Sequence, residues 1–278
     1  MILNCAGKAL NLSSPCVMGI LNVTPDSFSD GGVFLEADAA LEQALRMVAD
    51  GAAIIDIGGE STRPGAQAVS EQEELDRVIP IIEALAKEID VPISIDTNKP
   101  EVMRAAVSAG AGMINDVMAL QVPGALEAAQ QLSVPVCLMH MQGEPRTMQQ
   151  NPQYQDVVAD ILAFFEQRIE VCVSAGIERS MLLVDPGFGF GKRLEHNQQL
   201  LKNLGKLQQL KLPLLVGISR KSMIGAMLND ASVDQRLHGS VAAAVMAYER
   251  GAAILRVHDV KPTVDALTVA EAVLNIDN

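Results

Sequence analysis

The sequence predicts an α/β protein that folds as a single (β/α)8 barrel, a TIM barrel, with residues 1–278 as one domain. Short apolar segments alternate with helical segments eight times, which indicates parallel strands joined by helices. A glycine-alanine pattern also recurs at the start of three predicted strands, at residues 51–54, 110–113 and 251–254. Eight such units in a chain of this length favour a closed barrel over an open sheet.

The strands are predicted from short apolar runs that end in a polar residue or a glycine. In one such run Ile54, Ile55 and Ile57 surround Asp56, and a glycine pair ends the run. The same pattern occurs along the whole chain. The predicted strands are residues 17–21, 54–57, 93–95, 113–114, 134–139, 181–184, 214–218 and the segment that begins at 254.

The helices are predicted from the signals at their ends. Ser70 and Glu73 form a capping box at the start of a long helix, and Pro80 is expected to kink or divide that helix. Pro100 suits the first position of a helix, and Gly51 suits a left-handed C-terminal cap. The other predicted helices are residues 38–50, 100–110, 123–131, 155–175, 195–210, 234–250 and 262–275.

The composition argues against several classes of function. A net charge of -13 and an aromatic content of 3% disfavour a nucleic-acid surface or a base-stacking platform. No apolar run reaches the roughly 20 residues of a membrane span, and the N-terminus lacks the features of a signal peptide. The four cysteines lack a C-x-x-C spacing, so we expect a reduced cytoplasmic protein without disulfides or a zinc site.

Polar side chains end every predicted strand. In a (β/α)8 barrel the carboxyl ends of the strands converge on one mouth, where the active site lies. Any one of these side chains could be a structural cap, but the whole set indicates a functional site. For Asp56, which lies within its strand, structural support and ligand contact both stay open. The strand-end residues are Asn22, Asp56, Asp96, Asn115, His140, Asp185, Lys221, Arg256 and His258.

These side chains divide into two chemical groups. Asp96, Asn115 and Asp185 offer acceptors and one amide, which suit the adjacent N–H donors of an amino-pyrimidinone ring. The second group offers donors for phosphate or carboxylate oxygens. It comprises Arg63, Lys221, Arg256 and His258. A flat, donor-rich ring with an anionic leaving group would satisfy both groups.

Other segments look like known functional motifs but lack the residue spacing that those motifs require. The glycine-rich segment 187–192 fits neither the dinucleotide fingerprint nor the phosphate-binding P-loop. The segment 217–221 is not a nucleophile elbow. The histidines are dispersed and form no H-x-H or H-E-x-x-H motif, which argues against a catalytic zinc. His196 and His238 fall in predicted helices and are interpreted as surface residues.

Seven segments of the chain resemble one known family. They include M-G-I-L-N-V-T-P-D-S-F-S-D-G-G at 18–32, D-I-G-G-E-S-T-R-P-G at 56–65 and D-P-G-F-G-F-G-K at 185–192. The others are residues 95–97, 114–116, 219–222 and 256–259. The chain resembles the dihydropteroate synthases of the bacterial folate pathway. The resemblance implies a pterin-binding TIM barrel that joins 4-aminobenzoate to (7,8-dihydropterin-6-yl)methyl diphosphate, with release of diphosphate.

The resemblance also implies roles for individual residues, with Arg63, Asp96, Asp185 and Lys221 as the catalytic set. The implied pterin contacts are Asp96, Asn115, Asp185 and Lys221. The implied diphosphate contacts are Asn22, Thr62, Arg63, Arg256 and His258, with Asn22 as a ligand of Mg²⁺. The implied 4-aminobenzoate contacts are Phe28, Arg63, Pro64, Phe190, Lys221 and Ser222. The family further suggests a homodimer and a target of sulfonamides.

Three alternatives are weighed against this interpretation. Another pterin-binding barrel, of the methyltetrahydrofolate:corrinoid methyltransferase type, would not need the anion-binding groups at residues 61–64 and 219–222. A non-catalytic paralogue that senses a pterin or diphosphate would be expected to lose Asn22, Arg63 or Lys221. A metal-dependent hydrolase barrel is disfavoured because the sequence has no H-x-H motif.

Overall fold

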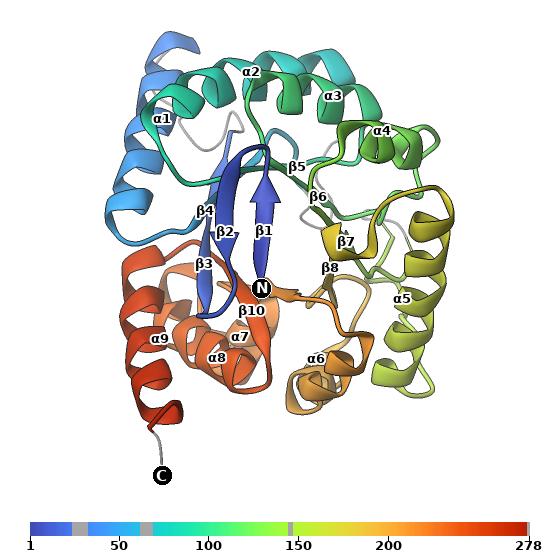
Figure 1. Cartoon of the computed structure of the whole chain (residues 1–278). Coiled ribbons are helices and arrows are strands. Elements are labelled where there is room, and N and C mark those ends of the chain that lie inside the picture. Colours follow the sequence, from blue (N-terminus) through green and yellow to red (C-terminus); the bar gives the residue numbers. More distant parts are fainter. Residues whose placement is uncertain (24–32, 62–68, 144–146, 277–278) are drawn as a thin grey trace.

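Eight parallel strands form a closed barrel surrounded by helices, as Figure 1 shows for the computed structural model. The structure describes residues 1–23, 33–61, 69–143 and 147–276, with the side chains of 33–37 left out. Around the barrel each strand pairs with the next one along the chain, and β10 closes the ring against β3. The strands are β3 (Cys16–Asn22), β4 (Ile54–Gly58), β5 (Ile93–Asp96), β6 (Met113–Asp116), β7 (Val136–Met139), β8 (Leu182–Asp185), β9 (Leu214–Val216) and β10 (Ala252–Val257). The predicted fold class is confirmed.

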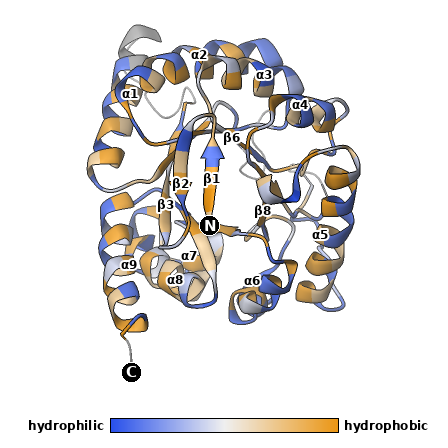
Figure 2. Ribbon diagram, viewed as in Figure 1, coloured by the Kyte–Doolittle hydropathy of each residue, from blue (hydrophilic) through white to orange (hydrophobic). Residues whose placement is uncertain are grey.

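The helices cover the outside of the barrel, and hydrophobic and hydrophilic residues alternate along their ribbons (Figure 2). Buried apolar residues of the helices, such as Val78, Ile82 and Phe165, belong to the same core as the strands. The α-helices are α1 (Val33–Ala49), α2 (Glu71–Glu88), α3 (Pro100–Ala109), α4 (Ala125–Leu132), α5 (Val157–Ser174), α6 (Leu194–Lys202), α7 (Ser222–Met227), α8 (Leu237–Glu249) and α9 (Val260–Leu274). Short 3₁₀ segments lie at Arg179–Met181 (η2), Leu204–Leu210 (η3) and Val233–Arg236 (η4). Within the described residues, no helix is long and apolar enough to cross a membrane.

Most helix boundaries agree with the predictions, and several details differ. Helix α1 begins at Val33 instead of at residue 38, and the start of the predicted helix 234–250 is a 3₁₀ segment. The capping box is present, with the Glu73 N–H donating to Ser70 Oγ at 3.2 Å. Helix α2 nevertheless runs undivided through Pro80, which lies on its exposed face while Val78 and Ile82 anchor the helix in the core. The predicted helix 195–210 is α6 followed by a 3₁₀ segment, and α7 was not predicted.

An N-terminal hairpin, which the sequence analysis did not predict, covers the amino-terminal end of the barrel. Strands β1 (Ile2–Cys5) and β2 (Lys8–Asn11) pair antiparallel and lie across the barrel axis in Figure 1. Alternate side chains, Leu3, Cys5 and Leu10, are buried against the inner residues of the barrel. The close approach excludes a side chain at Gly112, because a Cβ there would lie 2.4 Å from the Cys5 carbonyl oxygen.

The interior of the barrel changes from apolar to polar along the strands. Next to the hairpin, an apolar layer comprises Met18, Ile54, Met113, Cys137, Leu183, Leu215 and Ile254. Side chains in a strand alternate between two faces, so the residue two positions further along each strand also points inward. On four strands that next residue is polar: Asp56, Asn115, Asp185 and Arg256. The strand period therefore places the polar side chains together at the carboxyl end of the barrel.

Candidate active site

The mouth of the barrel contains a cluster of buried charged side chains. Arg256 on β10 donates from Nε to Asp56 Oδ2 at 2.6 Å and from Nη2 to Asp96 Oδ2 at 2.7 Å. Asn115 on β6 donates from Nδ2 to the same Asp56 oxygen at 3.1 Å. Because Asp56 is fully buried, its negative charge depends on Arg256 for compensation. Four strands thus contribute to one hydrogen-bonded group.

Two buried polar atoms beside this cluster have no hydrogen-bond partner among the described residues. They are Asp56 Oδ1 and Ser94 Oγ, and their residues are register partners on β4 and β5. Buried polar atoms without partners are uncommon in native proteins. Asp56 Oδ1 and Ser94 Oγ therefore keep unused hydrogen-bonding capacity inside the barrel, next to the cluster.

Burial shifts the acids of the mouth toward neutrality. It raises the pKa of Asp96 to about 7, against the opposing effect of Arg256 and with a further increase from Asp56. It also raises the pKa of Asp185, which Lys221 opposes. Perturbed acids that face a basic partner in a cleft are typical of functional sites.

A second group of side chains lies on β8 and on the loops that follow β8 and β9. Lys221 donates from Nζ to the Phe188 carbonyl oxygen, and Nζ lies 4.5 Å from the centroid of the Phe190 ring. Burial lowers the pKa of Lys221 to about 8, although Asp185 opposes this shift. The Gly187 N–H donates to Asp185 Oδ1 at 2.8 Å, so the loop after β8 orients this carboxylate.

The loop after β9 is tied to the end of β10. The backbone N–H of His258 donates to Ser219 Oγ at 3.2 Å, and His258 Nδ1 lies 3.1 Å from the same oxygen. Arg220 forms a two-point ion pair with Asp259, at 2.8 and 2.5 Å, and such paired contacts fix geometry as well as charge. These contacts, at the two residues that precede Lys221, hold its backbone in place.

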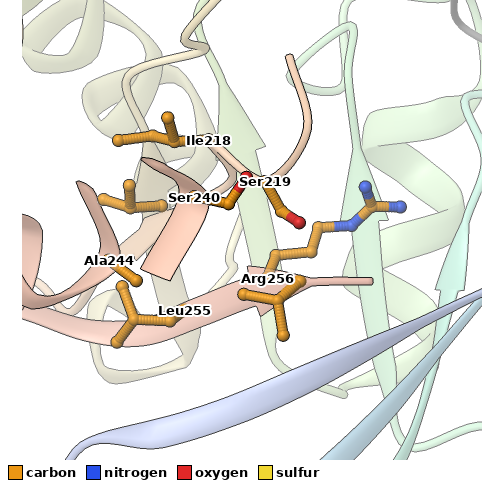
Figure 3. A pocket seen from close by; sticks show the side chains of 8 residues that line it. Ile218, Ser219, Ser240, Ala244, Leu255 and Arg256 are labelled. Carbon is orange, nitrogen blue, oxygen red and sulfur yellow. The ribbon is translucent and has the colours of Figure 1, made fainter. Parts of the chain in front are cut away.

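A small cavity lies behind the barrel wall, between β9, β10 and α8 (Figure 3). Its lining includes Ser219, Ser240 and Ala244, and the Arg256 side chain extends away from it (Figure 3). With a volume of about 10 Å³ it has room for one water molecule. It is therefore too small for a substrate, and the reactive side chains belong to the barrel mouth.

Of the nine predicted site residues that lie in the described part of the chain, the structure brings six together in two groups. Asp96, Asn115 and Arg256 meet in the first group, and Asp185, Phe190 and Lys221 meet in the second. Asn22 ends β3, Ser222 begins α7 and His258 follows β10. Phe28, Thr62, Arg63 and Pro64 lie outside the described residues, so their predicted contacts stay predictions.

From the sequence, the role of Asp56 stayed undecided between structural support and ligand contact, and no role was predicted for Lys192. Asp56 could have been placed by strand alternation, since it shares a face with Ile54, an inner residue of the barrel. Lys192 is 3% exposed, and no pattern in the sequence indicates that a lysine after a glycine-rich segment is buried. The four cysteines are all free and buried, as expected.

A closed parallel barrel with ionisable groups of both signs at the carboxyl ends of its strands defines the chain as a barrel enzyme. Comparisons with known proteins identify the class of barrel enzyme to which the chain belongs. Residues 18–258 match the family model described as pterin binding enzyme. The chain belongs to this family and, within it, to the dihydropteroate synthases, which are transferases. The resemblance inferred from the sequence is confirmed.

The relatives match over nearly the whole chain. Dihydropteroate synthase of Haemophilus influenzae is 57% identical over 268 residues, which cover 96% of this chain and 97% of the relative. The crystal structure of the Yersinia pestis dihydropteroate synthase with a sulfonamide drug complex has a TM-score of 0.94, with 59% identity and 99% of both chains covered. The Xanthomonas albilineans enzyme in complex with 7,8-dihydropteroate has a TM-score of 0.92, with 52% identity and 100% of both chains covered.

Proposed function

We propose that the two groups of side chains in the mouth carry out the dihydropteroate synthase reaction as a binding, charge-stabilising site without a covalent enzyme intermediate. The observation that supports this most directly is the buried cluster of Asp56, Asp96, Asn115 and Arg256, which carries an unpartnered acceptor. A dihydropterin ring presents adjacent N–H donors that match such acceptors. Asp96, Asn115, Asp185 and Lys221 are proposed to hold this ring.

The diphosphate is proposed to bind above the ring. Arg256 has five N–H donors, two of which serve Asp56 and Asp96, so it has the capacity to contact a phosphate oxygen as well. His258 follows on the same strand end. The further proposed contacts are Asn22, Thr62 and Arg63, of which Thr62 and Arg63 lie outside the described residues.

A Mg²⁺ ion fits the residues at this position only together with the substrate. Asn22 offers one amide oxygen, and the described residues contain no group of three His, Cys, Asp or Glu side chains that could hold a metal. Mg²⁺ commonly combines one or two protein oxygens with substrate phosphates and water. We propose Asn22 as its protein ligand, where the ion would neutralise charge on the leaving diphosphate.

The chain's own side chains would then stabilise the charge that develops on the pterin. Loss of diphosphate breaks the C–O bond and leaves positive charge on the methylene group and the ring. Asp96 and Asp185 are proposed to stabilise that charge. The amine of 4-aminobenzoate forms the new C–N bond with its lone pair and then loses a proton. Phe28, Arg63, Pro64, Phe190, Lys221 and Ser222 are proposed to position it.

Turnover by the purified protein tests this function. Protein with Mg²⁺, the pterin diphosphate and 4-aminobenzoate should release diphosphate and form 7,8-dihydropteroate, and folded protein without turnover would refute the proposal. Without the amine, positional isotope scrambling within the substrate diphosphate is expected if the C–O bond breaks first. Cleavage that strictly requires the amine would contradict this order of steps.

The plot of kcat/KM against pH should be a narrow bell-shaped curve. Asp96 accepts ring N–H groups only as a carboxylate, so activity is lost as the pH falls through its pKa of about 7. Lys221 acts as an ammonium group, so activity is lost as the pH rises through its pKa of about 8. The maximum is therefore expected between these values. Asp96→Asn should flatten the acid limb, and an unchanged acid limb in this variant would contradict the assignment.

Two further properties are proposed on the same basis. A homodimer is supported by exposed apolar side chains on the C-terminal elements, including Met246, Val269 and Val273. A cytoplasmic location fits the reduced, buried cysteines. Methyl transfer from methyltetrahydrofolate is the alternative activity for this barrel, and the turnover assay with each substrate pair separates the two.

A further inference from the structure

Lys192, in the loop between β8 and α6, is the centre of a buried hydrogen-bonded group. Its Nζ lies 2.9 Å from the Gly187 carbonyl oxygen, 3.0 Å from the Phe190 carbonyl oxygen and 3.0 Å from His140 Nδ1. The His140 carbonyl oxygen is a further acceptor at 3.4 Å. Lys192 and His140 are only 3% and 6% exposed. A lysine that is buried to this extent requires such a set of partners.

Lys192 keeps its contacts to the loop carbonyl oxygens in either protonation state. Burial, together with the charge of Lys221, lowers the pKa of Lys192 well below its usual range, and the nearby Asp185 opposes this shift. Burial, together with the charge of a protonated Lys192, lowers the pKa of His140 to about 2. An ammonium group has three N–H donors, whereas a neutral amine has two, which serve the Gly187 and Phe190 carbonyl oxygens while its lone pair accepts from a proton on His140 Nδ1. Lys192 therefore donates to both carbonyl oxygens whether or not it is charged.

The loop that Lys192 holds supports the second group of site residues. Between its two carbonyl contacts, at Gly187 and Phe190, lies Phe188, whose carbonyl oxygen accepts from Lys221. The Phe190 ring lies next to the ammonium group of Lys221. The loop also packs tightly on the end of β7, because a Cβ at Gly187 would lie 1.9 Å from the His140 carbonyl oxygen. Movement of this loop would displace Lys221 from its partners.

We propose that Lys192 is a positioning residue of the active site, which locks the β8–α6 loop to the end of β7 and thereby places Lys221 and Phe190. This role rests on the proposed function of Lys221. Lys192 itself need not contact either substrate. It acts through the Gly187 and Phe190 carbonyl oxygens.

Steady-state kinetics of Lys192→Met test this role across the pH range. We expect kcat/KM at pH 7.5 to fall by about tenfold or more, with an unchanged far-UV circular dichroism spectrum. Lys192→Gln, whose neutral amide can still donate to two carbonyl oxygens, should recover most of that loss.

The control is Lys202→Met, which removes an exposed lysine from α6 and should keep both the rate and the pH profile. A Lys192→Met enzyme within threefold of wild type would overturn the proposal, as would a Lys192→Gln enzyme that is as slow as Lys192→Met. If Lys192→Met does not fold, a folded Lys192→Gln enzyme that is slower than wild type by more than about threefold would overturn the proposal, because its amide keeps the two carbonyl contacts. Wild-type turnover tests the proposed function separately.

Discussion

Replacing Arg256 with methionine should cost both stability and activity. Arg256 compensates Asp56, which is fully buried, and also pairs with Asp96. Removing one partner of a buried ion pair typically destabilises by about 3–5 kcal/mol, because the other charge stays behind without compensation. For a chain of this size that corresponds to a fall in Tm of about 10 °C, measurable by calorimetry.

Activity should fall with stability in the Arg256→Met variant, by about 100-fold in kcat/KM, because Asp96, a proposed pterin contact, and Asp56 lose their shared partner. The double variant Arg256→Met/Asp56→Asn removes the uncompensated charge, so it should recover part of the Tm but none of the activity. Arg46→Met serves as the control, since Arg46 forms only an exposed ion pair with Glu42 on α1 and such pairs contribute little. An Arg256→Met protein whose Tm falls by less than about 2 °C would show that the pair is dispensable.

Replacing Lys221 or Asp185 with alanine should lower kcat/KM by about tenfold or more, equivalent to at least about 1.4 kcal/mol of transition-state stabilisation. The Lys221 variant lacks the charge near the Phe190 ring, and the Asp185 variant lacks the proposed acceptor for the pterin. The two charges influence each other's pKa. Their effects should therefore be less than additive in the double variant.

The measurement for Lys221 and Asp185 is steady-state kinetics at saturating concentrations of each substrate in turn. Lys206→Ala, on the exposed surface of η3, provides the matched control. Activity within twofold of wild type in either single variant would remove that residue from the site. Strict additivity would show that the two side chains act independently.

The sequence predicted the barrel because its strand and helix signals repeat locally. Alternation of apolar runs, the capping box at Ser70 and the glycine that follows each of several helices all act within a few residues. Gly51, Gly110 and Gly251 adopt φ values of 98°, 121° and 93°, which explains why glycine ends those helices. Features that depend on distant packing were harder to predict. Helix α2 continues through Pro80 because the core holds its opposite face.

Which residues form the candidate site was predictable from the sequence, but which of them pair with one another was not. The strand-end positions of Asp96, Asn115 and Arg256 follow from the period of the strands. That Arg256 pairs with Asp56 depends on closing the barrel between β10 and β3, which joins residues 200 positions apart in the chain. Lys192 was unpredictable for a related reason, since its burial follows from the close packing of the β8–α6 loop on His140.

The N-terminal hairpin has a consequence for the order of kinetic events. Since it seals the amino-terminal end of the barrel, both substrates must arrive, and both products must depart, through the opposite opening. A pterin that sits against the inner acids would be trapped beneath 4-aminobenzoate once the latter has bound. The enzyme should therefore follow a compulsory sequence, in which the pterin diphosphate enters first and the finished dihydropteroate must clear the same passage before another cycle begins.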